Sequence, residues 1–178
     1  MHCYVQTFDF GTKVHNLLNA AKGYVPKRYC SCYRVKPLNY YKGAIVTIID
    51  RSTDWQVMRK LPHGKDANEA AKTIVHLLEP YRKWIKTITT DNGAEFFRHE
   101  YITRKLGVKM YFADPHAPWQ KGGIENTNGL IRQYIPNGTD FKNVSQQRIK
   151  MIQRIINARP REKLNFLTPD EAVYKKTS

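Results

Sequence analysis

The hydrophobic pattern is clearest after residue 41, where apolar runs and polar turns alternate along the chain. Residues 44–49 form a continuous apolar, β-branched run, which is typical of a strand buried on both faces. The polar residues 50–54 supply turn chemistry, and residues 55–61 then predict the returning strand of a hairpin. Two short β-branched segments, residues 86–90 and 108–112, predict further strands.

Apolar positions at helical spacing predict several helices between and after these strands. Asp66 with Glu69 forms a capping-box pattern ahead of the first helix. Gly107 ends the second helix, and Thr168 followed by Pro169 opens the last one. The expected helices are 67–78, 96–106, 123–134, 145–158 and a short one after Pro169, and in the fourth of them Ile149, Ile152, Ile155 and Ile156 form one apolar face.

This order of elements indicates an α/β fold, with a mixed sheet flanked by helices. Residues 1–41 differ in composition, because they hold all three cysteines, six of the eleven tyrosines and a single acid, Asp9. We therefore expect an atypical N-terminal arm over residues 1–41 and a core domain over residues 42–178 that is incomplete at its N-terminal edge. The arm has a faint strand pattern at residues 5–10 and a short helical pattern at 13–22, so the first strand of the sheet is doubtful.

Charge narrows the choice of partner. The chain has 30 Lys plus Arg against 15 Asp plus Glu, a net charge of +15, which favours nucleic acid first and an anionic membrane surface second. Neither a long apolar run nor a secretory signal pattern is present, so we expect a cytoplasmic protein without a membrane segment. The cysteines are expected to be free thiols, since Cys30 and Cys32 have the wrong spacing for a zinc site with His2 or His15.

Two acidic residues are candidates for metal chemistry. Asp91 follows directly on the strand predicted at residues 86–90, and the carboxyl ends of strands are where α/β sheets usually bind ligands. Glu125 lies in the first turn of the helix predicted at 123–134. Taken singly, Asp91 also suits a turn and Glu125 also suits the positive end of a helix dipole. Together they could share magnesium, which takes a few carboxylates with water and phosphate oxygens.

An ordered series of motifs after residue 41 carries a resemblance to a known family. The motifs are residues 42–51, residues 87–96 (TITTDNGAEF), residues 122–134 (GGIENTNGLIRQY), and residues 136–141, 157–161 and 168–172. With them the chain resembles the insertion sequence thirty family of transposases, which are relatives of retroviral integrases. The likeness covers nearly everything after residue 41.

The resemblance implies a ribonuclease-H-like fold, a divalent metal (Mg²⁺ or Mn²⁺), and cutting and joining of DNA by hydroxyl attack on phosphodiesters. On this pattern Asp91 and Glu125 are the second and third of three catalytic, metal-binding carboxylates. The implied partners are transposon-end and target DNA, and a homo-oligomer or a mixed oligomer with an intact transposase. The expected DNA contacts, each with ordinary surface charge or packing as its alternative, are Trp119, Lys121, Asn126, Asn128 and Arg132.

The chain departs from the family pattern at the first catalytic Asp. The family places this Asp on a strand shortly before residue 42, but residues 30–41 contain no acid. We interpret the departure, together with the missing amino-terminal DNA-recognition region, as a frameshift, an upstream rearrangement or a mis-set start. Asp9 ranks first among substitutes, despite a connection of some thirty residues to the next strand, while Asp50 and Asp54 are expected at the far end of the hairpin.

The sequence therefore predicts a transposase core that lacks strand-transfer activity as written. The alternative from another class is a non-catalytic DNA-binding remnant, which could compete with an intact transposase or join its oligomer. Salt-dependent DNA binding without metal-dependent cleavage would favour the remnant. A third option is a ribonuclease-H-like nuclease, which would hydrolyse RNA–DNA hybrids without joining ends.

Overall fold

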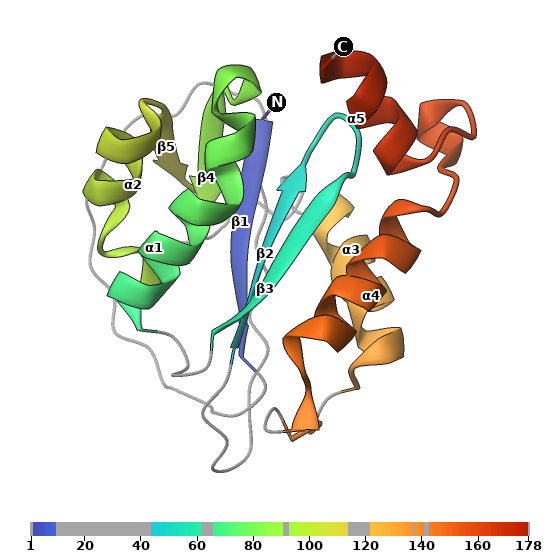
Figure 1. Ribbon diagram of the computed structural model, residues 1–178, viewed down its shortest axis with the longest axis horizontal. Helices are drawn as coiled ribbons and strands as arrows, with labels where there is room; N and C mark the ends of the chain where they lie inside the picture. Colours follow the sequence, from blue (N-terminus) through green and yellow to red (C-terminus); the bar gives the residue numbers. More distant parts are fainter. Residues whose placement is uncertain are drawn as a thin grey trace.

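One five-stranded sheet organises the described part of the chain (Figure 1). The computed structural model describes residues 2–9, 44–61, 66–90, 93–113, 122–136, 138–140 and 143–177, with backbone alone for residues 2–9, 95, 122–125, 176 and 177. Helices cover both faces of the sheet, α1 and α2 on one side and α3 and α4 on the other. The expected mixed α/β class is therefore confirmed.

The strand order is β3-β2-β1-β4-β5. The strands are β1 (His2–Asp9), β2 (Ala44–Asp50), β3 (Gln56–Leu61), β4 (Thr87–Thr90) and β5 (Lys109–Phe112). The first three pair antiparallel, whereas β4 is parallel to both β1 and β5. The predicted hairpin is β2 and β3, and the two predicted short strands are β4 and β5.

The central strand, drawn in blue in Figure 1, is β1. It pairs with β2 from Cys3 opposite Asp50 to Asp9 opposite Ala44, and with β4 as far as Tyr4 opposite Thr89. The faint pattern at residues 5–10 thus belongs to the strand that joins the two parts of the sheet. Its signal is weak because polar residues interrupt a strand that is paired on both sides. The short helix expected at 13–22 lies outside the described residues.

Two helices lie on the β4 side, and each has one of the expected capping residues. α1 (Ala67–Leu78) starts at Asp66, whose side chain accepts a hydrogen bond from the Glu69 amide at 2.8 Å. α2 (His99–Leu106) is shorter than expected, because Ala94–Phe96 forms a separate 3₁₀ turn before it. Gly107 ends α2 in the left-handed region, at φ 68°.

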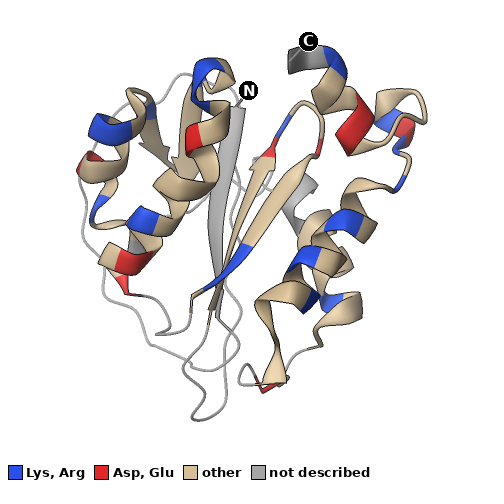
Figure 2. Cartoon of the chain, viewed as in Figure 1, with Lys and Arg blue, Asp and Glu red and all other residues tan. Residues whose placement is uncertain are grey.

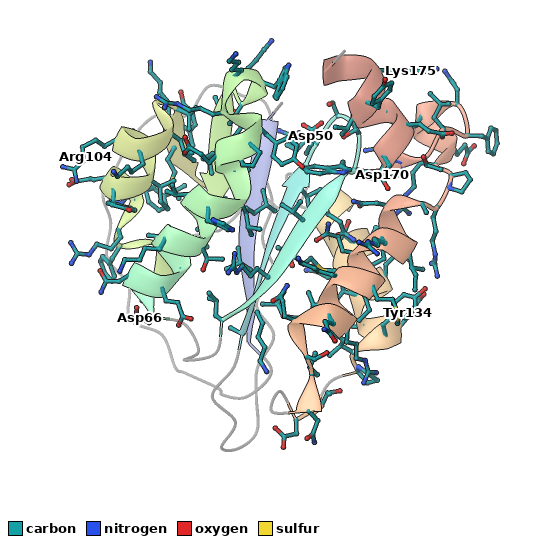
Figure 3. The ribbon with its side chains drawn as sticks, in the orientation of Figure 1. Asp50, Asp66, Arg104, Tyr134, Asp170 and Lys175 are labelled. Atoms are coloured by element: carbon teal, nitrogen blue, oxygen red, sulfur yellow. The ribbon has the colours of Figure 1, made fainter. Side chains whose placement is uncertain are left out.

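Three further helices follow the sheet. They are α3 (Gly122–Tyr134), α4 (Gln146–Asn157) and α5 (Pro169–Thr177). α3 and α4 pack on the sheet through a cluster that includes Ile45 of β2 and Met58 of β3. α5 lies beside the turn between β2 and β3, where the Trp55 indole donates to the Asp170 carboxylate at 3.0 Å (Figure 3). None of the helices in the described ranges combines the length and hydrophobicity that a membrane crossing requires.

The prediction that Ile155 belongs to the buried face of α4 is wrong. Ile149, Ile152 and Ile156 of α4 are buried, but Ile155 is 37% exposed. At about 100° per residue, Ile155 points roughly 100° away from Ile156 and so leaves the apolar face.

α4 also covers the outer edge of β3 with side-chain amides. Gln146, Gln153 and Asn157, here called the amide ladder, accept hydrogen bonds from the backbone amides of Lys60, Met58 and Gln56 at 2.8, 2.8 and 3.1 Å. The Asn157 amide also donates to the Gln56 carbonyl at 2.9 Å. The edge strand therefore has its outward amide groups satisfied by a helix instead of another strand.

Candidate functional site

The carboxyl end of β4 provides the scaffold for the predicted site. Thr90, the last residue of β4, is fully buried, and its carbonyl accepts a hydrogen bond from the Ala113 amide at 2.7 Å. This bond holds the ends of β4 and β5 together. Asp91 comes directly after Thr90 in the sequence, although Asp91 itself lies outside the described residues.

The chain after Asp91 returns to the core within a few residues. Phe96 is 1% exposed and packs in the core between α1 and the sheet, which anchors the segment. The His99 ring then packs edge-on against Phe112 of β5, with centroids 5.0 Å apart. Phe97, between these anchors, is 79% exposed. The sequence did not distinguish the two neighbouring phenylalanines, because both fit the same apolar pattern.

Glu125 lies in the first turn of α3, and its side chain is not among the described ones. The side of α3 that faces the sheet carries Asn128, Ile131 and Ile135. Seven residues correspond to nearly two helical turns, so Arg132 lies about 20° around the axis from Glu125. Arg132 is half-buried, and it lies on the side of α3 from which Glu125 starts.

The other residues predicted to contact DNA differ in their exposure to solvent. Asn126 is exposed on α3, whereas Asn128 is only 4% exposed and lies in the interior. Trp119 and Lys121 lie outside the described residues. The convergence of Asp91 and Glu125 stays a prediction, since it depends on side chains that are not described.

The candidate substitutes for the first carboxylate are all away from the end of β4. Asp9 lies five residues, or about 16 Å of strand, beyond Tyr4, the last β1 residue paired with β4. Asp50 is 1% exposed, and its carboxylate accepts hydrogen bonds from the Ser52 and Thr53 hydroxyls at 2.8 Å each.

Asp54 in the same turn forms an ion pair with Lys163. Because β2 runs antiparallel to β1, and β1 is parallel to β4, Asp50 and Asp54 lie toward the start of β4. Both acids therefore stabilise the hairpin turn and its contact with the C-terminal region.

Positive charge gathers on the helical hairpin of α3 and α4. Figure 2 shows Lys and Arg bands along α4 and no acidic band there. Between Asn126 and Arg161 the sequence has one acid, Asp140, against seven basic residues, which are Arg132, Lys142, Arg148, Lys150, Arg154, Arg159 and Arg161.

Tyr134 connects part of this charge to the end of α3. The Arg148 guanidinium donates to the Tyr134 carbonyl at 3.3 Å, and Arg159 donates to the Tyr134 hydroxyl at 2.5 Å. Arg159 also lies over the Tyr134 ring, 5.7 Å from its centroid. The contacts hold two guanidinium groups beside the last turn of α3, where positive charge also suits the helix dipole.

Metal-binding chemistry is not visible in the described side chains. Among them, no group of three His, Cys, Asp or Glu residues is arranged to hold an ion. The side chains of Asp91, Glu125, Cys30 and Cys32 lie outside the described ones.

Comparison with known proteins gives a consistent group of relatives. The chain is 51% identical over 131 residues to the transposase for insertion sequence element IS4351 of Bacteroides fragilis, covering 74% of this chain and 40% of the relative. It is 38% identical over 131 residues to the IS1086 transposase of Cupriavidus metallidurans, with coverage of 72% and 38%. The InsI transposase of element IS30C of Escherichia coli is 38% identical over 132 residues, with coverage of 74% and 34%.

The chain thus spans between 34 and 40% of the length of these curated relatives. No family model matches the sequence.

Proposed function

Since this chain belongs to the IS30 family of insertion-sequence transposases, we propose that it corresponds to the catalytic core that cuts and joins DNA at transposon ends. The single observation that carries the proposal is the placement of its motifs. Asp91 directly follows β4, and Glu125 occupies the first turn of α3, which packs on the same sheet. A strand end and a helix start are suitable scaffolds for carboxylates that act on a phosphodiester.

The proposed fold is ribonuclease-H-like. What supports it is an antiparallel meander of β1, β2 and β3, followed by β4 and β5 parallel to β1, in the order 3-2-1-4-5. Helices on both faces complete the arrangement. In this fold the centre of β1 and the end of β4 contribute to one site, which makes the residues of β1 decisive for activity.

The proposed metal is Mg²⁺ or Mn²⁺, held by Asp91 and Glu125. Their donor set suits one hard cation, which takes one or two carboxylates and completes its shell with water and phosphate oxygens. When bound, such an ion would stabilise the negative charge that develops on the scissile phosphate. Two carboxylates are too few for the pair of ions that strand transfer is expected to use.

The proposed DNA contacts are Arg132 and Lys121 for phosphates, with Asn126 and Trp119 beside them. Arg132 is supported by its position on the Glu125 side of α3. The basic surface of α4 extends this region with exposed cations and no acid. A homo-oligomer or an oligomer with an intact transposase belongs to the same proposal.

We further propose that the chain as written does not transfer strands. β1 carries no acid next to its pairing with β4, because residues 4, 5 and 6 are Tyr, Val and Gln. Asp9 lies three residues, or about 10 Å of strand, beyond Gln6, where the register between β1 and β4 would continue to position 91. This missing carboxylate is the observation that favours the second candidate function, a non-catalytic DNA-binding remnant.

The test uses the purified chain, transposon-end DNA, and Mg²⁺ or Mn²⁺. We expect DNA binding that weakens as salt rises, without nicking or joining of the ends. Metal-dependent joining that disappears in Asp91→Asn would contradict the proposed inactivity. Absence of salt-dependent binding would contradict the DNA-binding function itself, and cleavage of RNA–DNA hybrids without joining would support a nuclease.

A further inference from the structure

A layer of buried polar atoms without protein partners lies between the sheet and α3. Thr47 and Gln56 are fully buried, and Asn128 is 4% exposed. Within the part of the chain that the structure describes, the Thr47 hydroxyl and both amide atoms of Gln56 and of Asn128 have no hydrogen-bond partner. Buried polar groups are seldom left unpaired, because desolvation is not repaid without a hydrogen bond.

The three side chains share one face of the sheet. Thr47 pairs with Met58 across β2 and β3, and Met58 packs in the cluster formed with α3 and α4. Gln56 precedes Met58 by two residues, so it lies on the same face of β3. Asn128 precedes Ile131 of that cluster by three residues, which puts it on the sheet-facing side of α3.

Apolar residues would avoid this unfavourable desolvation. The neighbours in the same cluster are Ile45, Ile131, Ile135, Ile152 and Ile156, so the surroundings accept aliphatic side chains. Buried polar groups that lower the stability of a fold are most common where function requires them. Here the layer is close to the catalytic helix turn, because Asn128 follows Glu125 by less than one turn, about 4.5 Å along the axis.

We propose that Thr47, Gln56 and Asn128 bind internal water molecules, and that this hydrated layer fixes the rotation of α3 and thereby the direction of Glu125. Internal water bridges buried polar groups by making about three hydrogen bonds, and two amides and a hydroxyl on packed elements offer that number. Asn128 is then a positioning residue that acts through Glu125, instead of a direct DNA contact. This inference rests on the proposed function, since it assigns the layer to the metal site of Glu125.

The first measurement is of water. Oxygen-17 relaxation dispersion detects water molecules that stay inside a protein long enough to tumble with it. The unaltered chain should show such molecules, and Asn128→Leu should lose at least one of them. Gln133→Leu, at an exposed position of the same helix, should leave the long-lived water unchanged. Absence of long-lived water in the unaltered chain would overturn the proposal.

The second measurement follows Mn²⁺ through the broadening of backbone amide signals in α3. Loss of supporting contacts around metal ligands commonly weakens metal binding 10- to 100-fold, so Asn128→Leu should require at least about tenfold more Mn²⁺. Asn128→Ser, which keeps a hydroxyl and leaves room for water, should recover most of the response. An unchanged Mn²⁺ response in Asn128→Leu would overturn the positioning role, even if water were lost.

The variants separate this inference from the proposed function. Glu125→Gln should abolish the Mn²⁺ effect while the water signal persists. If Mn²⁺ leaves even the unaltered chain unchanged, the proposed metal site fails, and the positioning role fails with it. Circular dichroism of each variant establishes that it is folded. If leucine prevents folding, Asn128→Ala, which removes the amide without adding bulk, becomes the variant in which the Mn²⁺ response should weaken.

Discussion

At the scale of single residues, the start of α5 depends on a reciprocal pair. The Thr168 amide and hydroxyl donate to the Glu171 carboxylate at 2.7 and 2.8 Å, and the Glu171 amide donates to the Thr168 hydroxyl at 3.2 Å. This is a capping box, in which two otherwise unpaired amides are satisfied together. The sequence suggested the cap from Thr168 and Pro169, and Glu171 completes it.

The capping box has a consequence for pH dependence. The hydrogen bonds from the Thr168 amide and hydroxyl, helped by the charge of Lys175, hold the pKa of Glu171 below its ordinary value. A carboxyl group whose pKa is lowered by folding stabilises the fold above its unfolded pKa, and this contribution is lost as pH falls through the folded pKa. An NMR titration should therefore find Glu171 ionising below the usual range for glutamate.

Thr168→Ala is the matched change for this titration. It removes the hydroxyl bond but keeps the amide, so the pKa of Glu171 should rise part of the way toward its ordinary value. A Glu171 that titrates at its ordinary value in the unaltered chain would show that the capping box does not persist in solution.

At the scale of elements, the amide ladder is the feature that was hardest to predict from the sequence. The apolar positions of α4 predicted the helix and most of its buried face, because burial repeats with the helical period. Gln146, Gln153 and Asn157 have the ordinary appearance of surface residues on a helix. Only the arrangement of α4 along the edge of β3 gives them a role, and that arrangement depends on contacts about 100 residues apart.

Gln153→Leu tests the amide ladder. The change leaves the Met58 amide without its acceptor, so we expect a loss of about 1–3 kcal/mol in the free energy of unfolding. Urea denaturation measures this loss, and gel filtration should reveal extra self-association through the opened edge of β3. Gln147→Leu is the control, because Gln147 is exposed on the same helix. Equal effects of the two changes would argue against the ladder.

Gly129 gives a second prediction for an element, in α3. It is exposed inside the helix, and a Cβ added there would meet no atom within 4 Å. Gly129→Ala should therefore stabilise the fold by about 1 kcal/mol through helix propensity, as measured by thermal or urea denaturation. If DNA approaches the backbone of α3 beside Glu125, the same change should weaken DNA binding.

Unchanged DNA affinity in the stabilised Gly129→Ala variant would place the DNA elsewhere on the surface. Arg132→Gln is the useful comparison, because removal of one phosphate contact should lower affinity and reduce its salt dependence.

At the scale of the whole molecule, the sequence allowed the mixed sheet to be predicted but not its centre. The runs that became β2 and β4 are rich in β-branched residues, and turns and caps bound them clearly. β1 lacked such boundaries, and a long connection separates it from its antiparallel partner. Pairing between distant segments is a property of the complete fold, which a local pattern does not report. For the same reason, the motifs placed Asp91 and Glu125 on elements without giving the distance between them.

The absent first carboxylate can be tested by restoring one. Tyr4 of β1 is paired with Thr89 of β4. Gln6 comes two residues after Tyr4, and Asp91 comes two residues after Thr89, so the same register would place Gln6 opposite Asp91. Positions in register on parallel strands share a face, so Gln6→Asp is the change expected to supply a third ligand. We expect it to create metal-dependent nicking of transposon-end DNA, which an added Asp91→Asn should abolish.

Val5→Asp is the control for this experiment, since its position alternates to the other face of β1. Nicking by both variants, or by neither, would count against the proposed register between β1 and the catalytic site. Circular dichroism and urea denaturation would show whether each inserted carboxylate is tolerated in a central strand.

The place of β1 in the sheet also bears on how much of the chain can be removed. Residues 1–41 carry none of the motifs that resemble the family, so a shortened chain would naturally begin near residue 42. That shortened chain would retain β2 and β3 as one ribbon and β4 and β5 as another, with the strand between them gone. Removing residues 1–41 would therefore remove β1, the strand that connects the two halves of the sheet.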